Sequence, residues 1–387
     1  MNTHFTLAEQ ALQLKRWPAD SDFPNLQAWD AVDELLLTTA FENIQTTKPH
    51  HVLVINDHFG AISCALLEAH PELMIWHRSD SRVSQLACQH NLALNQLDSS
   101  QLNFINSLDP CPIQPDMVIM RIPRDHGYLQ YQLQQLTDEI SAQTALLIAA
   151  KAKDIHKNLL QLFSNTLGPT SASLTIKKCR LLQCQLQWPL PKTDKLWPKK
   201  WPALAQNVQL INHANVFSGD QLDIGARFLL AHLPTTQAGQ TLVDLGCGNG
   251  VLGLSALLAN PELHVIFCDE SYMAVESARL TVMENAPHLA AQCTFLIDDG
   301  LSQQAKASAD WVLCNPPFHQ QQTITTHVAK QMFVDAKRVL KPGGHLRIVA
   351  NRHLPYGQQL QRIFAGCRCI ASQAKFIILE SQLRSKA

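Results

Sequence analysis

Charge, aromatic residues and long hydrophobic runs are all scarce in this sequence. Charged residues make up 16% of the 387 residues and aromatic residues 6%, against 46% hydrophobic residues, a composition that excludes a disordered chain. No apolar run approaches the roughly 18 residues of a membrane-spanning helix. The N-terminus also has no apolar core of signal-peptide type. We therefore expect a cytoplasmic protein that does not enter a membrane.

Paired cysteines and metal-binding spacings are lacking as well. The 11 cysteines form no CxxC pair, which favours reduced thiols over a disulfide framework. The 17 histidines show no spacing with cysteine that is typical of zinc, so we expect no metal. The sequence leaves the oligomeric state open, with a monomer as the simplest expectation.

The chain contains an internal duplication. Its length predicts two domains of about 150–200 residues. Residues 51–81 align without a gap on residues 241–271. Identical pairs in and after this block include Gly60 with Gly250, Ser81 with Ser271 and Asn95 with Asn285. We infer two copies of one fold, with domains at 1–186 and 209–387 and a Pro- and Trp-rich linker at 187–208.

Each copy alternates short apolar segments, typical of buried strands, with helical segments. In the second copy the strand segments are TLVDL, HVIFCD, CTFLID, DWVLCN and HLRIVA. This alternation predicts an α/β protein with two tandem Rossmann-like domains, each a doubly wound sheet. Ligands of such sheets bind beyond the carboxyl ends of the strands, where the strand order reverses.

The segment DLGCGNG (244–250) joins the first strand of the second copy to its first helix. Its glycines allow a ligand to approach the backbone. Residues 248–253, GNGVLG, also satisfy GxGxxG, so a dinucleotide site is an alternative, and a mere tight turn is another. Carboxylates favour S-adenosylmethionine, because Asp244 can orient the loop or face its cationic end, Asp269 suits ribose and Asp299 suits the adenine amino group. The candidate cofactor residues are Asp244, Gly246, Gly248, Gly250, Asp269 and Asp299.

Asn315-Pro316-Pro317-Phe318 follows the fourth strand of the second copy. Two prolines fix the backbone and supply no amide hydrogen. The Asn315 side-chain oxygen and the Pro316 carbonyl can therefore both accept hydrogen bonds from one planar NH2 group, which localises the lone pair on its nitrogen for methyl transfer. Phe318 can stack on a flipped base. We predict Asn315, Pro316 and Phe318 as catalytic residues.

The first copy lacks both the glycine loop and the NPPF segment. Asn56 and His58 replace Gly246 and Gly248, and Arg121-Ile122-Pro123-Arg124 replaces NPPF. We expect this copy to bind no cofactor and to serve in substrate docking and shielding.

A basic stretch crosses the middle of the chain. It is interpreted either as a solvated connector or as a surface for RNA phosphates. Arg352, after the fifth strand of the second copy, is a further substrate candidate because it lies at the ligand-binding end of the sheet. Phe217 and Gly225 precede the glycine loop and suit either a lid or ordinary packing at a helix start. The candidate phosphate contacts are Lys177, Lys178, Arg180, Lys199 and Lys200.

From the residues alone, three functions stay open: methylation of an RNA guanine, methylation of another NH2 group such as that of DNA adenine or protein glutamine, and a non-catalytic RNA-binding assembly factor. The order DLGCGNG, CDES, NPPFHQ and IVANRHLPY, after a degenerate first copy, resembles the bacterial ribosomal RNA guanine-N2 methyltransferases. LQAWDAVDELLL and HANVFSGDQLDIGARF are similar to the large-subunit (23S) group, methyltransferase G, with the small-subunit (16S) group as the alternative. The resemblance implies two class I methyltransferase folds, S-adenosylmethionine as cofactor, and a 23S rRNA guanine as substrate. It assigns the cofactor to the glycine loop and aspartates above, and the base to NPPF.

Overall fold

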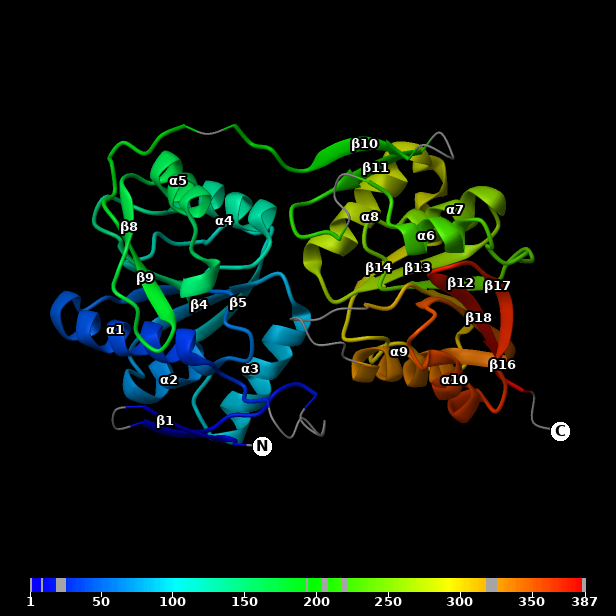
Figure 1. Cartoon of the computed structure of the whole chain (residues 1–387), viewed down its shortest axis with the longest axis horizontal. Helices are drawn as coiled ribbons and strands as arrows, with labels where there is room; N and C mark the ends of the chain where they lie inside the picture. Colours follow the sequence, from blue (N-terminus) through cyan, green and yellow to red (C-terminus); the bar gives the residue numbers. More distant parts are fainter. Residues whose placement is uncertain are drawn as a thin grey trace. The chain divides into compact units, whose positions relative to one another are not determined.

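Figure 1 shows the computed structural model of the chain, which divides into two compact units, Met1–Leu196 and Trp197–Ala387. The structure describes residues 2–7, 10–18, 26–192, 194–203, 208–217, 221–317 and 326–384. Phe318 lies outside these residues, so its predicted role stays a prediction. No helix within the described ranges is long and apolar enough to cross a membrane. The same ranges contain no group of three or more His, Cys, Asp or Glu side chains that could hold a metal ion.

The first unit is built on a seven-stranded sheet with the order β5-β4-β3-β6-β7-β9-β8. The first five of these strands run parallel, and β9 returns antiparallel beside β7. The strands of the unit are β1 (His4–Leu7), β2 (Gln10–Gln13), β3 (His51–Ile55), β4 (Met74–Ser79), β5 (Leu102–Asn106), β6 (Met117–Arg121), β7 (Ala145–Lys151), β8 (Thr170–Ala172) and β9 (Cys179–Cys184). The helices are α1 (Ala31–Thr47), α2 (Ala61–Ala69), α3 (Arg82–Leu94), α4 (His126–Glu139), the 3-10 turn η1 (Ala152–Asp154) and α5 (Lys157–Thr166).

The second unit repeats this sheet with the order β14-β13-β12-β15-β16-β18-β17. Its strands are β10 (Lys199–Ala203), β11 (Val208–Asn212), β12 (Thr241–Leu245), β13 (His264–Asp269), β14 (Cys293–Ile297), β15 (Ala309–Cys314), β16 (Leu340–Asn351), β17 (Arg368–Ser372) and β18 (Phe376–Gln382). The helices are α6 (Ile224–Leu230), α7 (Val251–Ala259), α8 (Tyr272–Asn285), the 3-10 turn η2 (Pro287–Gln292), α9 (Thr326–Val339) and α10 (Tyr356–Phe364). The identical order of the two sheets confirms the predicted pair of doubly wound α/β domains. The order reverses between β12 and β15, which is where such sheets bind ligands.

Alternating side chains of each central strand build two core layers. In the second unit Leu242 packs in one cluster with Leu252 of α7. The next residue, Val243, packs in the other with Phe333 of α9 and Leu360 of α10. Helices α7 and α8 therefore cover one face of the sheet and α9 and α10 the other, as Figure 1 shows.

The repeated asparagine of the sequence has the same structural task in both units. Asn95 of the first unit bonds both the amide and the carbonyl of Gln13 on β2, each at 2.8 Å. Asn285 of the second unit bonds both groups of Gln209 on β11, again at 2.8 Å. Each asparagine thus fastens a short antiparallel strand pair, β1–β2 or β10–β11, to a helix of its own unit.

The boundary between the units falls inside the segment predicted as a linker, between Leu196 and Trp197. The structure differs from a plain connector at residues 199–203, which form β10 and pair antiparallel with β11. Trp201 on β10 packs against the core of the second unit and donates a hydrogen bond to Asn212 at 3.2 Å. Pro202 is compatible with this strand because an edge strand does not need every amide hydrogen.

Candidate active site

Asp244, near the end of β12, anchors the glycine loop. Its buried Oδ2 accepts a hydrogen bond of 2.8 Å from the amide of Gly253 in the first turn of α7. Its Oδ1 is buried too and has no partner among the described residues. Burial raises the pKa of this carboxyl to about 7, and the nearby Asp269 adds to the rise. Because an unpaired buried acceptor is costly, Asp244 fits a ligand that brings a donor or a positive charge.

The loop glycines divide into two kinds. All three residues have positive φ, +72° at Gly246, +53° at Gly248 and +78° at Gly250. A Cβ on Gly246 would approach only the Cε of Met332, at 3.4 Å, and one on Gly248 would meet nothing within 4 Å in the described part of the chain. A Cβ on Gly250 would lie 2.8 Å from the Cβ of Ala278 on α8. Gly246 and Gly248 therefore border open space suited to a ligand, whereas Gly250 also serves helix packing.

The first unit shows why only the third glycine persists in both copies. Gly60 has φ +80°, and a Cβ there would lie 2.6 Å from the Cα of Cys88 on α3. This packing need exists with or without a ligand. Asn56, at the position of Gly246, donates hydrogen bonds to the carbonyl of Arg121 at 2.8 Å and to Gln132 at 3.0 Å. In this unit a side chain occupies a position that glycine keeps open in the other.

Asp269 ends β13 and shapes the glycine loop. Its carboxylate accepts hydrogen bonds of 3.1 Å from the amides of Gly248 and Ser271. Burial raises the pKa of this carboxyl, while these backbone hydrogen bonds oppose the rise. The position at a strand end beside the loop matches the carboxylate that binds ribose hydroxyls in related sheets.

The two aspartates after β14 have different tasks. Asp298 is buried, and its carboxylate accepts hydrogen bonds of 2.8 Å from the amides of both Asp299 and Gln303. Asp298 is thereby committed to the turn itself. Asp299 remains the candidate for the adenine amino group.

Asn315 follows β15 directly, at the point where the strand order reverses. Its Nδ2 donates to Oδ2 of Asp223 at 3.2 Å. Its Oδ1 is buried and has no partner within the residues that the structure describes. Pro316 and Pro317 come next and offer no amide hydrogen to this oxygen. The result is a fixed acceptor that suits the N–H of an amino group.

Two more buried polar atoms lie at or just after the carboxyl end of β16, the strand beside β15. Oδ1 of Asn351 and the hydroxyl of Tyr356 have no partner among the described residues. Burial raises the pKa of Tyr356 to about 12, with a contribution from Cys314 on β15. Sequence reasoning assigned no role to Tyr356 or to Asp223. The only signal for Asp223 is an aspartate three residues before a helical alanine, which is typical of a helix cap but not of a site residue.

The predicted phosphate contacts in the first unit lie on the β8–β9 hairpin. Lys177 pairs with Glu34 at 2.6 Å on the exposed surface. Arg180 donates from Nε to the carbonyl of Ser173 at 2.6 Å and so stabilises the hairpin itself. Lys178 is exposed. The three residues share one hairpin, but Arg180 has a structural task that sequence reasoning did not foresee.

The predicted contacts in the second unit are more dispersed. Lys200 pairs with Glu284 of α8, and the Lys199 ammonium lies 4.2 Å from the ring centroid of Trp197. Arg352 is exposed directly after β16, at the same end of the sheet as Asn315. Lys199 pairs in β10–β11 with Asn212, which accepts a hydrogen bond of 3.2 Å from Asn249 of the glycine loop.

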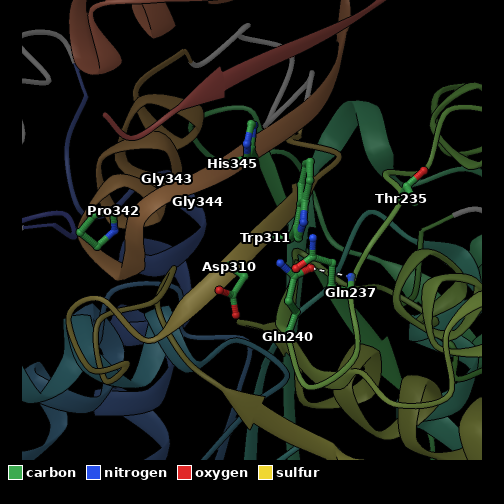
Figure 2. A pocket seen from close by; sticks show the side chains of 9 residues that line it. All are labelled: Thr235, Gln237, Gln240, Asp310, Trp311, Pro342, Gly343, Gly344 and His345. Atoms are coloured by element: carbon green, nitrogen blue, oxygen red, sulfur yellow. Dashed lines mark hydrogen bonds between the residues drawn. The ribbon is translucent and has the colours of Figure 1, made fainter. Parts of the chain in front are cut away.

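Figure 2 shows a pocket at the opposite, amino end of the same strands. Its Asp310 carboxylate is bonded to Lys341 at 2.7 Å and to the amide of Thr241 at 2.9 Å. The ring of Trp311 stacks on His345 at 4.6 Å. These groups bind one another at the end of the sheet opposite the glycine loop. The pocket is therefore not part of the site described above. It is lined by Thr235, Gln237, Gln240, Asp310, Trp311, Pro342, Gly343, Gly344 and His345.

Family models match both halves of the chain. Residues 2–188 match the model described as RLMG N-terminal domain, and residues 207–380 match the methyltransferase small domain. A solved structure, the T. thermophilus 16S rRNA N2-guanine methyltransferase in complex with AdoMet and guanosine, has a TM-score of 0.74 and 22% identity over 99% of this chain and 98% of its own. It shows the same tandem fold.

Two curated relatives are both named ribosomal RNA large subunit methyltransferase G. The protein of Pseudoalteromonas translucida is 42% identical over 98% of this chain and 98% of its own length. That of Yersinia pestis (strain Pestoides F) is 44% identical over 97% of this chain and 93% of its own length. Together with the tandem fold and the single intact glycine loop, these matches show that the chain belongs to the ribosomal RNA large subunit methyltransferase G family.

Proposed function

We propose that this protein transfers the methyl group of S-adenosylmethionine to the exocyclic N2 of a guanine in 23S rRNA. The observation that carries the proposal is the buried, unpartnered Oδ1 of Asn315 within the described residues, held at the switch point of the second sheet. An acceptor in that place matches a substrate NH2 group. The choice of guanine and of the large-subunit RNA as the substrate rests on the family to which the chain belongs.

The second unit supplies the cofactor site. Asp244 and the space above Gly246 and Gly248 receive the methionine end, Asp269 takes the ribose hydroxyls and Asp299 the adenine amino group. S-adenosylmethionine brings an electrophilic methyl group to this end of the sheet. The residues present fit it, because an unpaired carboxylate oxygen and two uncrowded glycines meet at one loop.

Asn315 and the Pro316 carbonyl act on the target nitrogen. By accepting hydrogen bonds from its two N–H groups, they draw the nitrogen toward tetrahedral geometry and localise its lone pair. The nitrogen becomes acidic once it carries the methyl group, so its proton passes to water and a strong general base is unnecessary. Phe318 stacks on the base, which must leave the helical stack to enter.

The first unit acts in substrate docking, and the basic residues contact phosphates. Its own loop position is occupied by Asn56, so the chain holds one cofactor. A ribosomal RNA substrate implies action in the cytoplasm. The small-subunit RNA is the alternative substrate, and a non-catalytic assembly role is the alternative that a methylation assay excludes.

The test uses total rRNA from a strain that lacks this protein, tritiated S-adenosylmethionine and the purified full chain. We expect label in 23S rRNA as N2-methylguanine at one position. Label confined to 16S rRNA contradicts the choice of subunit, and the lack of any label contradicts the enzyme.

The pKa of Asp244 predicts a pH dependence of cofactor affinity. This carboxyl titrates near pH 7 rather than near its ordinary 3.8. A cationic ligand or donor at Oδ1 selects the ionised form, so affinity should rise by up to about tenfold per pH unit below 7 and then level off. Without cofactor the sign is opposite: the folded chain holds this proton more tightly than the unfolded chain, so stability falls as pH rises from 3.8 toward 7.

Calorimetry between about pH 5.5 and 8.5 checks this dependence. The Asp244→Asn variant cannot titrate and should show affinity independent of pH in the same range. If the cofactor affinity of the wild type is as independent of pH as that of the variant, the assignment of Asp244 is contradicted.

Replacement of Lys199 and Lys200 by alanine should weaken RNA binding evenly across sequences. Bound phosphates release counterions, so the slope of log affinity against log salt should fall by about one unit for each lysine–phosphate interaction that the substitutions remove. The exposed pair of Lys200 with Glu284 contributes little to stability, so the fold should persist. Filter binding of rRNA and of an unrelated RNA across salt concentrations measures both slopes. Unchanged slopes contradict phosphate binding by Lys199 and Lys200 and favour the interpretation of this segment as a connector.

A further inference from the structure

The acceptor oxygen of Asn315 is oriented by a residue outside the NPPF segment. Nδ2 of Asn315 lies 3.2 Å from Oδ2 of Asp223, 92 positions earlier in the chain. A carboxylate only accepts hydrogen bonds, so the amide must turn its NH2 toward Asp223 and its oxygen away. That oxygen is the buried Oδ1 for which the described residues offer no donor.

Asp223 is itself fixed by the start of α6. It is the N-cap of that helix, and its Oδ2 accepts from the amide of Ala226 at 2.9 Å as well as from Asn315. Gly225 gives the pair its room, because a Cβ there would lie 2.9 Å from Oδ2 of Asp223 and 3.4 Å from Oδ1 of Asn315. A helix start and a strand end thus hold one amide between them.

The first unit contains the same contact with different chemistry. Asp30 caps α1 by accepting from the amide of Val32 at 2.9 Å. Arg121 donates from Nη1 to Asp30 at 3.0 Å. Strands β3 and β6 pair as β12 and β15 do, which places Arg121 at the position of Asn315. A guanidinium has no acceptor and can offer nothing to an amino group. Only the second unit combines the capping aspartate with an amide oxygen.

We infer that Asp223 is a positioning residue for the methylation proposed above, on which this inference rests. Its carboxylate keeps Oδ1 of Asn315 turned toward the target amino group. The charge-assisted contact also polarises the amide and strengthens Oδ1 as an acceptor while positive charge develops on the substrate nitrogen. Without Asp223 the amide can rotate and present its own NH2, which opposes the NH2 of the base.

Three variants of the full chain separate positioning from helix capping. Asp223→Ser keeps a good N-cap but is too short to reach Asn315, Asp223→Asn keeps both cap and reach without the charge, and Asp223→Ala loses both. Each is measured on rRNA from the deletion strain for kcat, for KM of the RNA, for S-adenosylmethionine affinity and for thermal stability. We expect kcat to fall about tenfold or more in the serine and alanine variants, with KM and cofactor affinity within about twofold of the wild type. Asp223→Asn should recover about a third or more of the wild-type kcat.

Three results would overturn the inference. A wild-type rate in Asp223→Ser reduces Asp223 to a helix cap. A parallel loss of kcat, cofactor affinity and thermal stability indicates a structural role. An Asp223→Asn variant no better than Asp223→Ser removes the rescue that positioning requires. The wild-type protein is scored first, because a wild type that methylates no rRNA contradicts the proposed function rather than the role of Asp223.

Discussion

Replacement of Asn315 by alanine is expected to lower the rate of methyl transfer by about 10²-fold or more, with S-adenosylmethionine affinity nearly intact. Oδ1 of Asn315 lacks a partner in the described structure and so is available to the substrate amino group. Its hydrogen bond strengthens as that nitrogen becomes tetrahedral, so its loss raises the barrier more than it weakens binding. Single-turnover methylation at saturating RNA measures the rate, and calorimetry measures the cofactor.

Asn285→Ala is the matched control, because it removes another asparagine amide from the same unit. Asn285 bonds the amide and the carbonyl of Gln209 and so fastens β11 to α8. This variant should lower thermal stability and leave the rate per folded molecule unchanged. Near-normal turnover by Asn315→Ala, or equal loss of rate in both variants, contradicts the base-orienting role.

The fold could be predicted from the sequence because its strongest signals arise from packing within each copy. Gly60 and Gly250 match because each starts a helix that crowds the next one, at Cys88 or at Ala278. Asn95 and Asn285 match in the sequence for a similarly local reason, because each side-chain amide holds a short pair of strands. Such constraints act in both copies whether or not a ligand binds, so they survive the divergence of the first copy.

The site could be predicted only in part. Asp244 and Asn315 stand in contiguous motifs, so the sequence could propose them as candidates. The contact of Asn315 with Asp223 spans 92 positions and exists only because α6 starts beside the end of β15. The ion pair of Lys200 with Glu284 likewise depends on how β10 lies against α8. No spacing rule within one sequence reports such tertiary partners, so charge counts alone could not show which of the candidate cations also pair within the protein.

Gly246→Arg is expected to abolish S-adenosylmethionine binding, and Gly248→Ala to weaken it by about 10-fold or more, as expected where a side chain enters space that a ligand backbone contact needs. The described residues place nothing within 4 Å of a Cβ on Gly248 and only Met332 near one on Gly246. The added atoms therefore collide with the cofactor rather than with the protein. Each substitution also costs about 1–2 kcal/mol of stability because φ is positive. Calorimetry of the wild type should give one site per chain.

Gly239→Ala separates backbone strain from loss of the cofactor. Gly239 has φ +73°, and the described structure again places nothing within 4 Å of a Cβ there, but it lies before β12 and outside the loop. It should lose as much stability as Gly248→Ala and keep full cofactor affinity. Gly250→Ala, whose Cβ would lie 2.8 Å from that of Ala278, should instead lose more stability than either. Equal loss of affinity in Gly239→Ala and Gly248→Ala, or two cofactor sites per chain, contradicts the assignment, because a strained backbone would then explain the effect without a ligand at the loop.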